Sequence, residues 1–319
     1  MGRRRLGPDR PNLQVGVNTV IRRWLVRLAW ANLVANIGIV VTGGAVRLTG
    51  SGLGCPTWPR CTEASYVPHE ELGINGAIEF GNRMLTFVLG VLAAALLITA
   101  IVAVVRERYW TALWWSLGIF LGIPAQAVVG GITVRTDLNP WVVAFHLLVS
   151  MVIVGVCVWF LDILSSPPRP AASPPSRTLA WLTLASGGVA LWLGTVVTGS
   201  GPHSGDLESR RTGLDPEIVS HVHGFSVWLL VALTIALTLV ARRRGDTRLA
   251  RFAGVLLVVE LAQGLLGYVQ FFTDLPALLV GIHMLGAAVI AAGLARVVVT
   301  AHQRSERPAG PPASGFPRR

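Results

Sequence analysis

Long apolar stretches alternate with short polar segments along almost the entire chain. A helix that crosses a bilayer needs about 20 mostly apolar residues. Stretches of that kind run over 28–46, 80–104, 110–132, 140–162, 179–198, 218–240, 250–272 and 276–296. Glycines interrupt some of them, which membrane helices tolerate. The pattern predicts an all-α polytopic membrane protein with eight transmembrane helices.

The composition supports a membrane protein. Of the 319 residues, 52% are hydrophobic and 13% are charged, whereas a soluble domain carries about 25% charged residues. All 27 basic residues are Arg, and 21 of them flank the same ends of the predicted helices. This positive-inside asymmetry predicts a cell-membrane protein with both termini in the cytoplasm. We therefore expect the net charge of +11 to face anionic lipid of the bilayer, and we expect no nucleic-acid partner.

The chain divides into two similar halves around a Pro-rich segment. Gln126-Ala-Val-Val-Gly130 matches Gln263-Gly-Leu-Leu-Gly267 at an offset of 137 (263 minus 126), and the same offset carries His146 onto His283. These matches predict two pseudo-symmetric four-helix bundles that form a parallel repeat. The predicted organisation is a basic cytoplasmic N-terminal segment at 1–27, an N-terminal half at 28–162, a cytoplasmic linker at 163–178, a C-terminal half at 179–296 and a disordered cytoplasmic tail at 297–319.

Several apolar stretches carry polar side chains at a similar depth. His146, His223 and His283 each lie about five to seven residues inside the same end of a different stretch, and Glu79 and Asn82 lie near the start of a fourth. Ionisable groups are costly in a bilayer and are rare there without a function. The repeat pairs His223 with His283 and Asn82 with His146 on facing helices, where bundles build cofactor sites. The pattern therefore favours flat metal cofactors held between helices.

Other readings of these residues stay open. Each histidine could be a core imidazole bonded to a neighbouring helix, and His221 competes with His223 because residues at i and i+2 cannot share a helix face. Glu79 could form an interfacial ion pair with Arg83. In the same outer region, where oxidation is expected, Cys55 and Cys61 are predicted to form a disulfide, with two free thiols or a metal site as the alternatives.

Several of these motifs resemble the haem A synthase family, over about residues 25–296, and look most like its actinobacterial branch. The helix that carries His283 is one of them. The others are Thr42-Gly-Gly-Ala-Val-Arg47-Leu-Thr-Gly-Ser-Gly-Leu-Gly-Cys55-Pro-Thr-Trp-Pro-Arg-Cys61, Glu79-Phe-Gly-Asn82-Arg83, Asn139-Pro-Trp-Val-Val-Ala-Phe-His146 and Thr198-Gly-Ser-Gly-Pro-His203-Ser-Gly-Asp206.

The resemblance implies a specific chemistry. Such enzymes oxidise a methyl group of haem O to a formyl group by successive hydroxylations, with O2 as the expected oxidant, and the product haem A serves terminal oxidase assembly. Carried over, His223 and His283 would be the axial ligands of a haem b, and His146 would face the iron of the substrate haem. Glu79 matches the family's essential acidic residue. Haem O synthase and cytochrome oxidase assembly factors would be its partners.

This chain departs from the family pattern in two places. Helix two often has His where this chain has Asn82, and some relatives have a second Cys pair where residues 199–217 have none. Arg47, Arg83 and Arg135 are predicted at the outer membrane edge, where they could bind haem propionates or lipid headgroups.

The alternative function is a dihaem b-type membrane electron-transfer protein without haem-modifying activity. It would have the same helices and histidines but would not need Glu79. A haem-binding transporter or chaperone is a further alternative. The sequence argues against a prenyltransferase that makes haem O, because these stretches contain no Asp-rich diphosphate-binding motif. The oligomeric state does not follow from the sequence.

Overall fold

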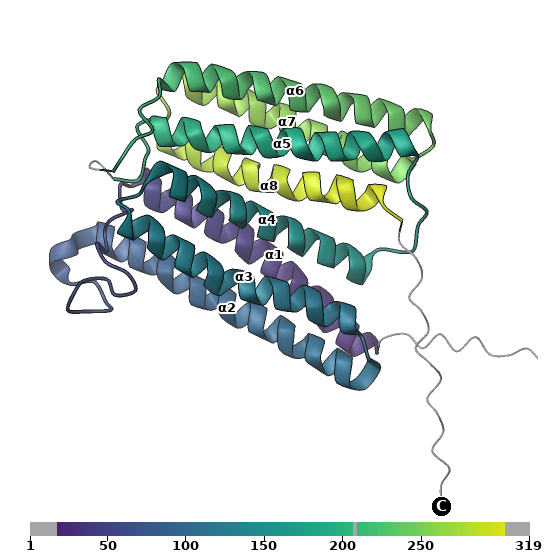
Figure 1. Cartoon of the computed structure of the whole chain (residues 1–319), viewed down its shortest axis with the longest axis horizontal. Helices are drawn as coiled ribbons and strands as arrows, with labels where there is room; N and C mark the ends of the chain where they lie inside the picture. Colours follow the sequence, from purple (N-terminus) through teal and green to yellow (C-terminus); the bar gives the residue numbers. More distant parts are fainter. Residues whose placement is uncertain (1–17, 207–208, 304–319) are drawn as a thin grey trace, which may run out of the picture.

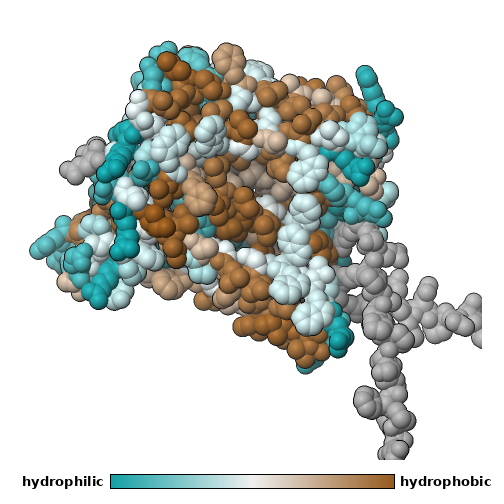
Figure 2. Space-filling model, viewed as in Figure 1, coloured by the Kyte–Doolittle hydropathy of each residue, from teal (hydrophilic) through white to brown (hydrophobic). Residues whose placement is uncertain are grey.

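The computed structural model describes residues 18–206 and 209–303. It contains α1 (Thr19–Leu48), the short 3-10 helix η1 (Glu70–Leu72), α2 (Gly73–Glu107), α3 (Trp110–Arg135), α4 (Pro140–Ser165), α5 (Pro174–Ser200), α6 (Pro216–Arg243), α7 (Thr247–Phe272) and α8 (Ala277–Ala301). Eight helices in this part of the chain are long and apolar enough to cross a membrane, which confirms the predicted all-α class. Figure 2 shows hydrophobic side chains across the middle of one face and hydrophilic ones at its two ends.

The helices form two rings of four. In the first ring, α1 packs on α2, α2 on α3, α3 on α4, and α4 closes on α1; α5 to α8 close in the same way. The rings touch through α4 and α1 on one side and α8 and α5 on the other (Figure 1). Within each ring, α2 therefore lies diagonally opposite α4, and α6 lies diagonally opposite α8.

The two ends of the molecule differ. The long connections 49–72 and 201–215 lie at one end, called here the loop end. The first residues of α1 and the last residues of α8 lie at the other, called here the termini end (Figure 1). The short turns between α2 and α3 and between α6 and α7 lie at the termini end too.

Caps at the loop end set the depth of two histidines. The Asn139 side chain accepts from Trp141 N and Asp215 accepts from Glu217 N, and Pro140 and Pro216 occupy the first helical position after these caps. An acceptor at the N-cap followed by Pro is a preferred helix start. His146 and His223 thus lie about two turns inside α4 and α6, as the sequence predicts.

Four helix boundaries differ from the predicted ones by five residues or more. α1 begins at Thr19 rather than near 28, α2 begins at Gly73 rather than 80, α5 begins at Pro174 rather than 179, and α8 continues to Ala301 rather than 296. Arg is a good helix former, so the basic residues at the start of α1 extend the helix rather than end it. The rest of the predicted N-terminal segment (1–17) and most of the predicted tail (304–319) lie outside the described residues.

In three helices of the C-terminal ring, the buried residues stop short of the loop end. The buried residues of α6 begin at Leu230, those of α7 end at Glu260 and those of α8 begin at Ala288. Within these three helices, which the structure describes completely, the loop-end portions 216–229, 261–272 and 277–287 contain no buried residue. The portions of α6 and α8 that carry His223 and His283 are therefore less covered by the rest of the protein than the portions near the termini end.

A buried ion-pair network joins the two rings at the termini end. Asp162 of α4, 4% exposed, contacts Arg169 of the linker at 2.8 Å and Arg296 of α8 at 3.0 Å. The Ser166 hydroxyl donates to the same carboxylate at 2.6 Å, and Arg248 of α7 donates to Ser166 at 3.0 Å. One carboxylate therefore holds the linker and the last helix against the first ring.

Replacing Asp162 with Ala should destabilise the protein strongly. The substitution leaves two largely buried guanidinium groups without their counter-charge, which typically costs about 3–5 kcal/mol. We expect a clearly lower midpoint of thermal unfolding for the purified variant.

Asp137→Ala is the matched control. The contact of Asp137 with Arg210 spans 3.9 Å, and both side chains are about two-thirds exposed, so its loss should change stability by about 0–1 kcal/mol. Equal destabilisation by the two substitutions would contradict a special role for the buried network.

Candidate functional site

His283 and His146 occupy matching environments in the two rings. In α7, Gln263 donates its Nε2 to the carbonyl oxygen of His283 at 2.6 Å. In α3, Gln126 donates its Nε2 to the carbonyl oxygen of His146 at 2.9 Å. The two glutamines are 137 residues apart, and so are the two histidines, which is the offset that aligns the two halves. The repeated residues thus make the same interhelical hydrogen bond in both rings.

A glycine of the adjacent helix faces each imidazole. A Cβ atom at Gly130 would lie 3.3 Å from Cε1 of His146, and one at Gly267 would lie 3.4 Å from Cε1 of His283. A larger side chain at either position would press on the ring. The two glycines, also related by the offset of 137, therefore help to fix the orientation of the imidazoles.

His223 is fixed by a different helix. Its ring lies against Gly194 of α5, where a Cβ atom would be 3.3 Å from Cε1, and near the carbonyl group of Ala190. His223 and His283 lie on diagonally opposed helices and are close enough for an electrostatic interaction. His221, by contrast, is exposed, and its Nδ1 pairs with the carbonyl oxygen of Glu217 at 2.9 Å. The structure therefore favours His223 over His221 as the residue that faces the ring interior.

The three histidines have unused ring nitrogens. Nδ1 of His146, His223 and His283 is buried and makes no hydrogen bond with the part of the chain that the structure describes. Buried polar atoms without a partner are rare and call for an explanation. Imidazole rings held in this way between helices are suited to bind a metal cofactor.

Asn82 lies on α2, the helix diagonally opposite the one that carries His146. Its Oδ1 atom accepts a hydrogen bond from the hydroxyl of Thr42 at 2.8 Å. A Cβ atom at Gly43 would lie 3.9 Å from its Nδ2 atom. The diagonal helices of the first ring thus carry an imidazole and a carboxamide, whereas those of the second ring carry two imidazoles.

Glu79 and Arg83 fasten the first outer loop to α2. Oε2 of Glu79 accepts from Cys55 N at 2.6 Å, and Oε1 accepts from Arg83 Nη2 at 2.6 Å and Nε at 3.1 Å. Arg83 also donates to the carbonyl oxygens of Cys55, Thr57 and Arg60 at 3.0, 3.0 and 3.2 Å. A guanidinium has five N–H groups, so all of them have acceptors here. A propionate at Arg83 would have to displace one of these acceptors.

The clamp of Glu79 and Arg83 holds a disulfide-bonded loop. Cys55 and Cys61 are bonded and completely buried, which confirms the predicted disulfide. Trp58, between them in sequence, packs against Gly131 of α3 so closely that a Cβ atom there would overlap its ring. Gly131 directly follows Gly130, the glycine that faces His146, so the loop lies close to His146.

The predicted propionate arginines do not come together. Arg47 is half-buried at the end of α1, donates to the carbonyl oxygen of His203 at 3.2 Å, and lies close to Arg211. It therefore connects the first ring to the second outer loop. Arg135 is exposed at the end of α3. With Arg83 in the loop clamp, the three arginines have three different surroundings.

A buried carboxylate of α7 is among the polar residues that the sequence analysis misses. Glu260 is 1% exposed, and its Oε1 atom accepts from the hydroxyl of Thr234 at 3.0 Å. At the offset of 137 it corresponds to Ile123, so the first half has no counterpart. The signal that could have found it is a single carboxylate inside an apolar stretch.

Comparison with known proteins gives consistent relatives. The haem A synthase of Rhizobium rhizogenes is 26% identical over 85% of this chain and 86% of its own length. The haem A synthase of Sinorhizobium fredii is also 26% identical, over 85% of this chain and 86% of its own length. The haem A synthase of Rhizorhabdus wittichii is 26% identical over 74% of this chain and 83% of its own length.

The family that matches is COX15-CtaA, described as cytochrome oxidase assembly protein, and the match covers residues 26–202. The matched region includes the disulfide loop, the Glu79–Arg83 clamp and His146. It amounts to more than half of the 319 residues. The protein therefore belongs to the COX15-CtaA family of cytochrome oxidase assembly proteins.

Proposed function

We propose that this protein is a haem A synthase, which oxidises a methyl group of haem O to a formyl group and so supplies haem A for terminal oxidase assembly. The observation that carries the proposal is the matched environment of His146 in the first ring and His283 in the second, in a chain of this family. The relatives named haem A synthase extend over most of the chain and include both rings. We also propose that the protein lies in the cell membrane with both termini in the cytoplasm, from its Arg distribution.

The C-terminal ring has the features that a haem b site requires. His223 and His283 offer two ring nitrogens from opposite helices, and the loop-end portions of α6, α7 and α8 around them contain no buried residue. Ligation by two imidazoles leaves no free position on the iron, so a haem b there would supply electron transfer. Gly194 and Gly267 would help to fix the orientation of the imidazole groups of His223 and His283.

The N-terminal ring is the proposed site of haem O. There His146 would face the iron of the substrate, opposite a carboxamide rather than a second imidazole. The difference between the two rings thus separates a site for electron transfer from a site for reaction with O2. We expect haem O to arrive from haem O synthase and haem A to pass to oxidase assembly factors.

Glu79 is proposed to act mainly by holding the disulfide loop over the substrate site. Its carboxylate accepts one hydrogen bond from the loop and two from Arg83, which itself binds three loop carbonyl groups. Charge-assisted hydrogen bonds of this kind are strong. A closed loop would shield the reacting methyl group from water.

Glu79→Gln and Arg83→Gln should both reduce haem A formation in cells that supply haem O, because each removes the Glu79–Arg83 ion pair. We expect a loss of about tenfold or more in each variant. Haem A is measured by chromatography of extracted haems. In the same variants, Cys55 and Cys61 should be reduced and alkylated faster than in the unmodified protein, because the loop is no longer held against α2.

Arg60→Gln is the control for the clamp. The Arg60 side chain donates to the carbonyl oxygen of Glu63 within the loop and does not bind Glu79, so haem A should form normally. Normal haem A from Arg83→Gln together with none from Glu79→Gln would show that Glu79 acts on the substrate directly. If a haem-b-loaded, unmodified chain formed no haem A, the dihaem electron-transfer protein would become the better explanation.

His223→Ala and His283→Ala should each abolish the low-spin b-type haem of the purified protein. Each substitution removes one of the two proposed axial ligands of that haem, so its reduced-minus-oxidised absorption bands should fall by about tenfold or more. Gly267→Leu should act in the same direction, because its side chain would occupy the space of the His283 ring.

The matched control is His221→Ala, whose ring is exposed and bonded to its own helix. This variant should keep the low-spin spectrum. Loss of the spectrum in His221→Ala, with retention in His223→Ala, would reverse the ligand assignment.

A further inference from the structure

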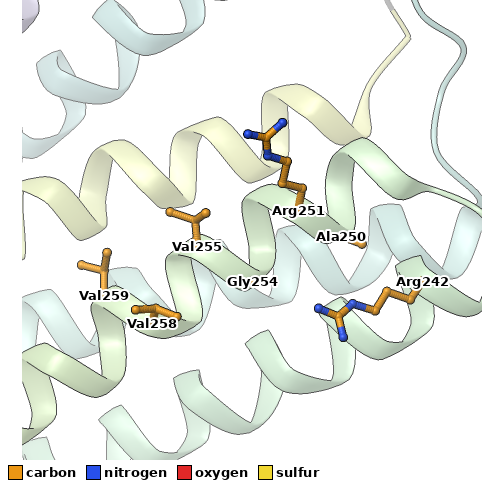
Figure 3. Close-up of a pocket in the computed structure, with 7 residues that line it drawn as sticks. All are labelled: Arg242, Ala250, Arg251, Gly254, Val255, Val258 and Val259. Atoms are coloured by element: carbon orange, nitrogen blue, oxygen red, sulfur yellow. The ribbon is translucent and has the colours of Figure 1, made fainter.

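A hollow opens between α6 and α7 near the termini end, away from both histidine sites. It has a volume of about 390 Å³, and its lining comes from Arg242 of α6 and, on α7, from Ala250, Arg251, Gly254, Val255, Val258 and Val259. Figure 3 shows the two arginines toward one end of the hollow and the three valines farther along α7. The hollow is therefore charged at one end and apolar along its length.

The charged end has no counter-charge in the protein. Arg242 and Arg251 are exposed, and neither guanidinium group takes part in an ion pair or hydrogen bond with the residues that the structure describes. The acidic residue of the adjacent turn, Asp246, already accepts from the hydroxyl groups of Ser173 and Ser176. Two guanidinium groups are thus free to bind an anion at this level of the membrane.

The apolar part runs from that level toward the middle of the membrane. Val255 and Val258 are 58% and 67% exposed, and from Arg251 to Val259 the helix rises about 12 Å. Gly254 lies between the arginine and the valines, and a Cβ atom there would meet nothing within 4 Å. The absence of a side chain at Gly254 keeps this part of the hollow open.

We propose that this hollow binds an anionic phospholipid of the leaflet at the termini end. Its phosphate contacts Arg242 and Arg251, and one acyl chain lies along Gly254, Val255 and Val258. Guanidinium groups bind phosphate oxygens in a bidentate manner, and basic clusters beside membrane helices attract anionic lipids. A free anion would use only the charged end of the hollow, whereas a phospholipid uses its full length.

Native mass spectrometry of the full-length protein in detergent tests this proposal, with titrations of phosphatidylglycerol and of phosphatidylcholine. Phosphatidylglycerol should bind about tenfold more tightly than phosphatidylcholine. The double variant Arg242→Gln/Arg251→Gln should lose this preference. Gly254→Leu should weaken the binding of both lipids, because its side chain fills the acyl-chain space.

Two control variants match these changes. Arg243→Gln/Arg244→Gln removes the same charge from the same cluster but from residues outside the hollow, and it should keep the preference. Gly118→Leu adds the same side chain to α3, also at a glycine whose Cβ atom would meet nothing within 4 Å, and it should bind as the unmodified protein does.

Three results would overturn the proposal. These are equal binding of both lipids by the unmodified protein, loss of the preference in both double variants alike, and unchanged binding by Gly254→Leu. Far-UV circular dichroism checks that every variant keeps its helical content, so that a loss of binding reports on the hollow.

Discussion

A bilayer offers no hydrogen-bond partners to a peptide group, so each backbone segment that crosses it must satisfy its own N–H and C=O groups. This constraint accounts for the eight helices and for their uninterrupted lengths. It also gives meaning to the few polar side chains within them, because a membrane interior provides no water to solvate them. Gln126, Gln263 and Glu260, for example, each form a hydrogen bond with a neighbouring helix.

Small residues allow these polar groups to be positioned. Gly130, Gly194 and Gly267 each bring a helix backbone against an imidazole ring. Gln126 and Gln263 then fix the backbone of the helix that carries the ring. Packing through small residues and interhelical hydrogen bonds replaces the hydrophobic effect as the source of specificity within a membrane. The same combination in both rings explains why the repeat is visible in the sequence.

The sequence predicts the helices and the depth of the histidines because both follow from local patterns. Apolar length identifies a span, and Asn139-Pro140 and Asp215-Pro216 mark helix starts. The sequence alone leaves free thiols or a metal site as alternatives to the disulfide, because only the folded loop brings Cys55 and Cys61 together.

The clamp of Glu79 and Arg83 could be predicted only in part. Their spacing of four residues indicates an ion pair, but the carbonyl groups that Arg83 binds come from an irregular loop with no periodic pattern. Likewise, nothing in the sequence links Arg47 to His203, which lies far along the chain. Contacts of this kind depend on how loops fold over the rings.

The buried carboxylate of Asp162 has a consequence for biosynthesis. It belongs to the fourth helix, but one of its partners, Arg296, lies near the end of the eighth. During synthesis the fourth helix enters the membrane long before Arg296 leaves the ribosome, and until then the carboxylate has only Arg169 of the linker as a cationic partner among these contacts. The first ring therefore reaches its final electrostatic environment only when the last helix docks, which couples completion of the chain to the contact between the two rings.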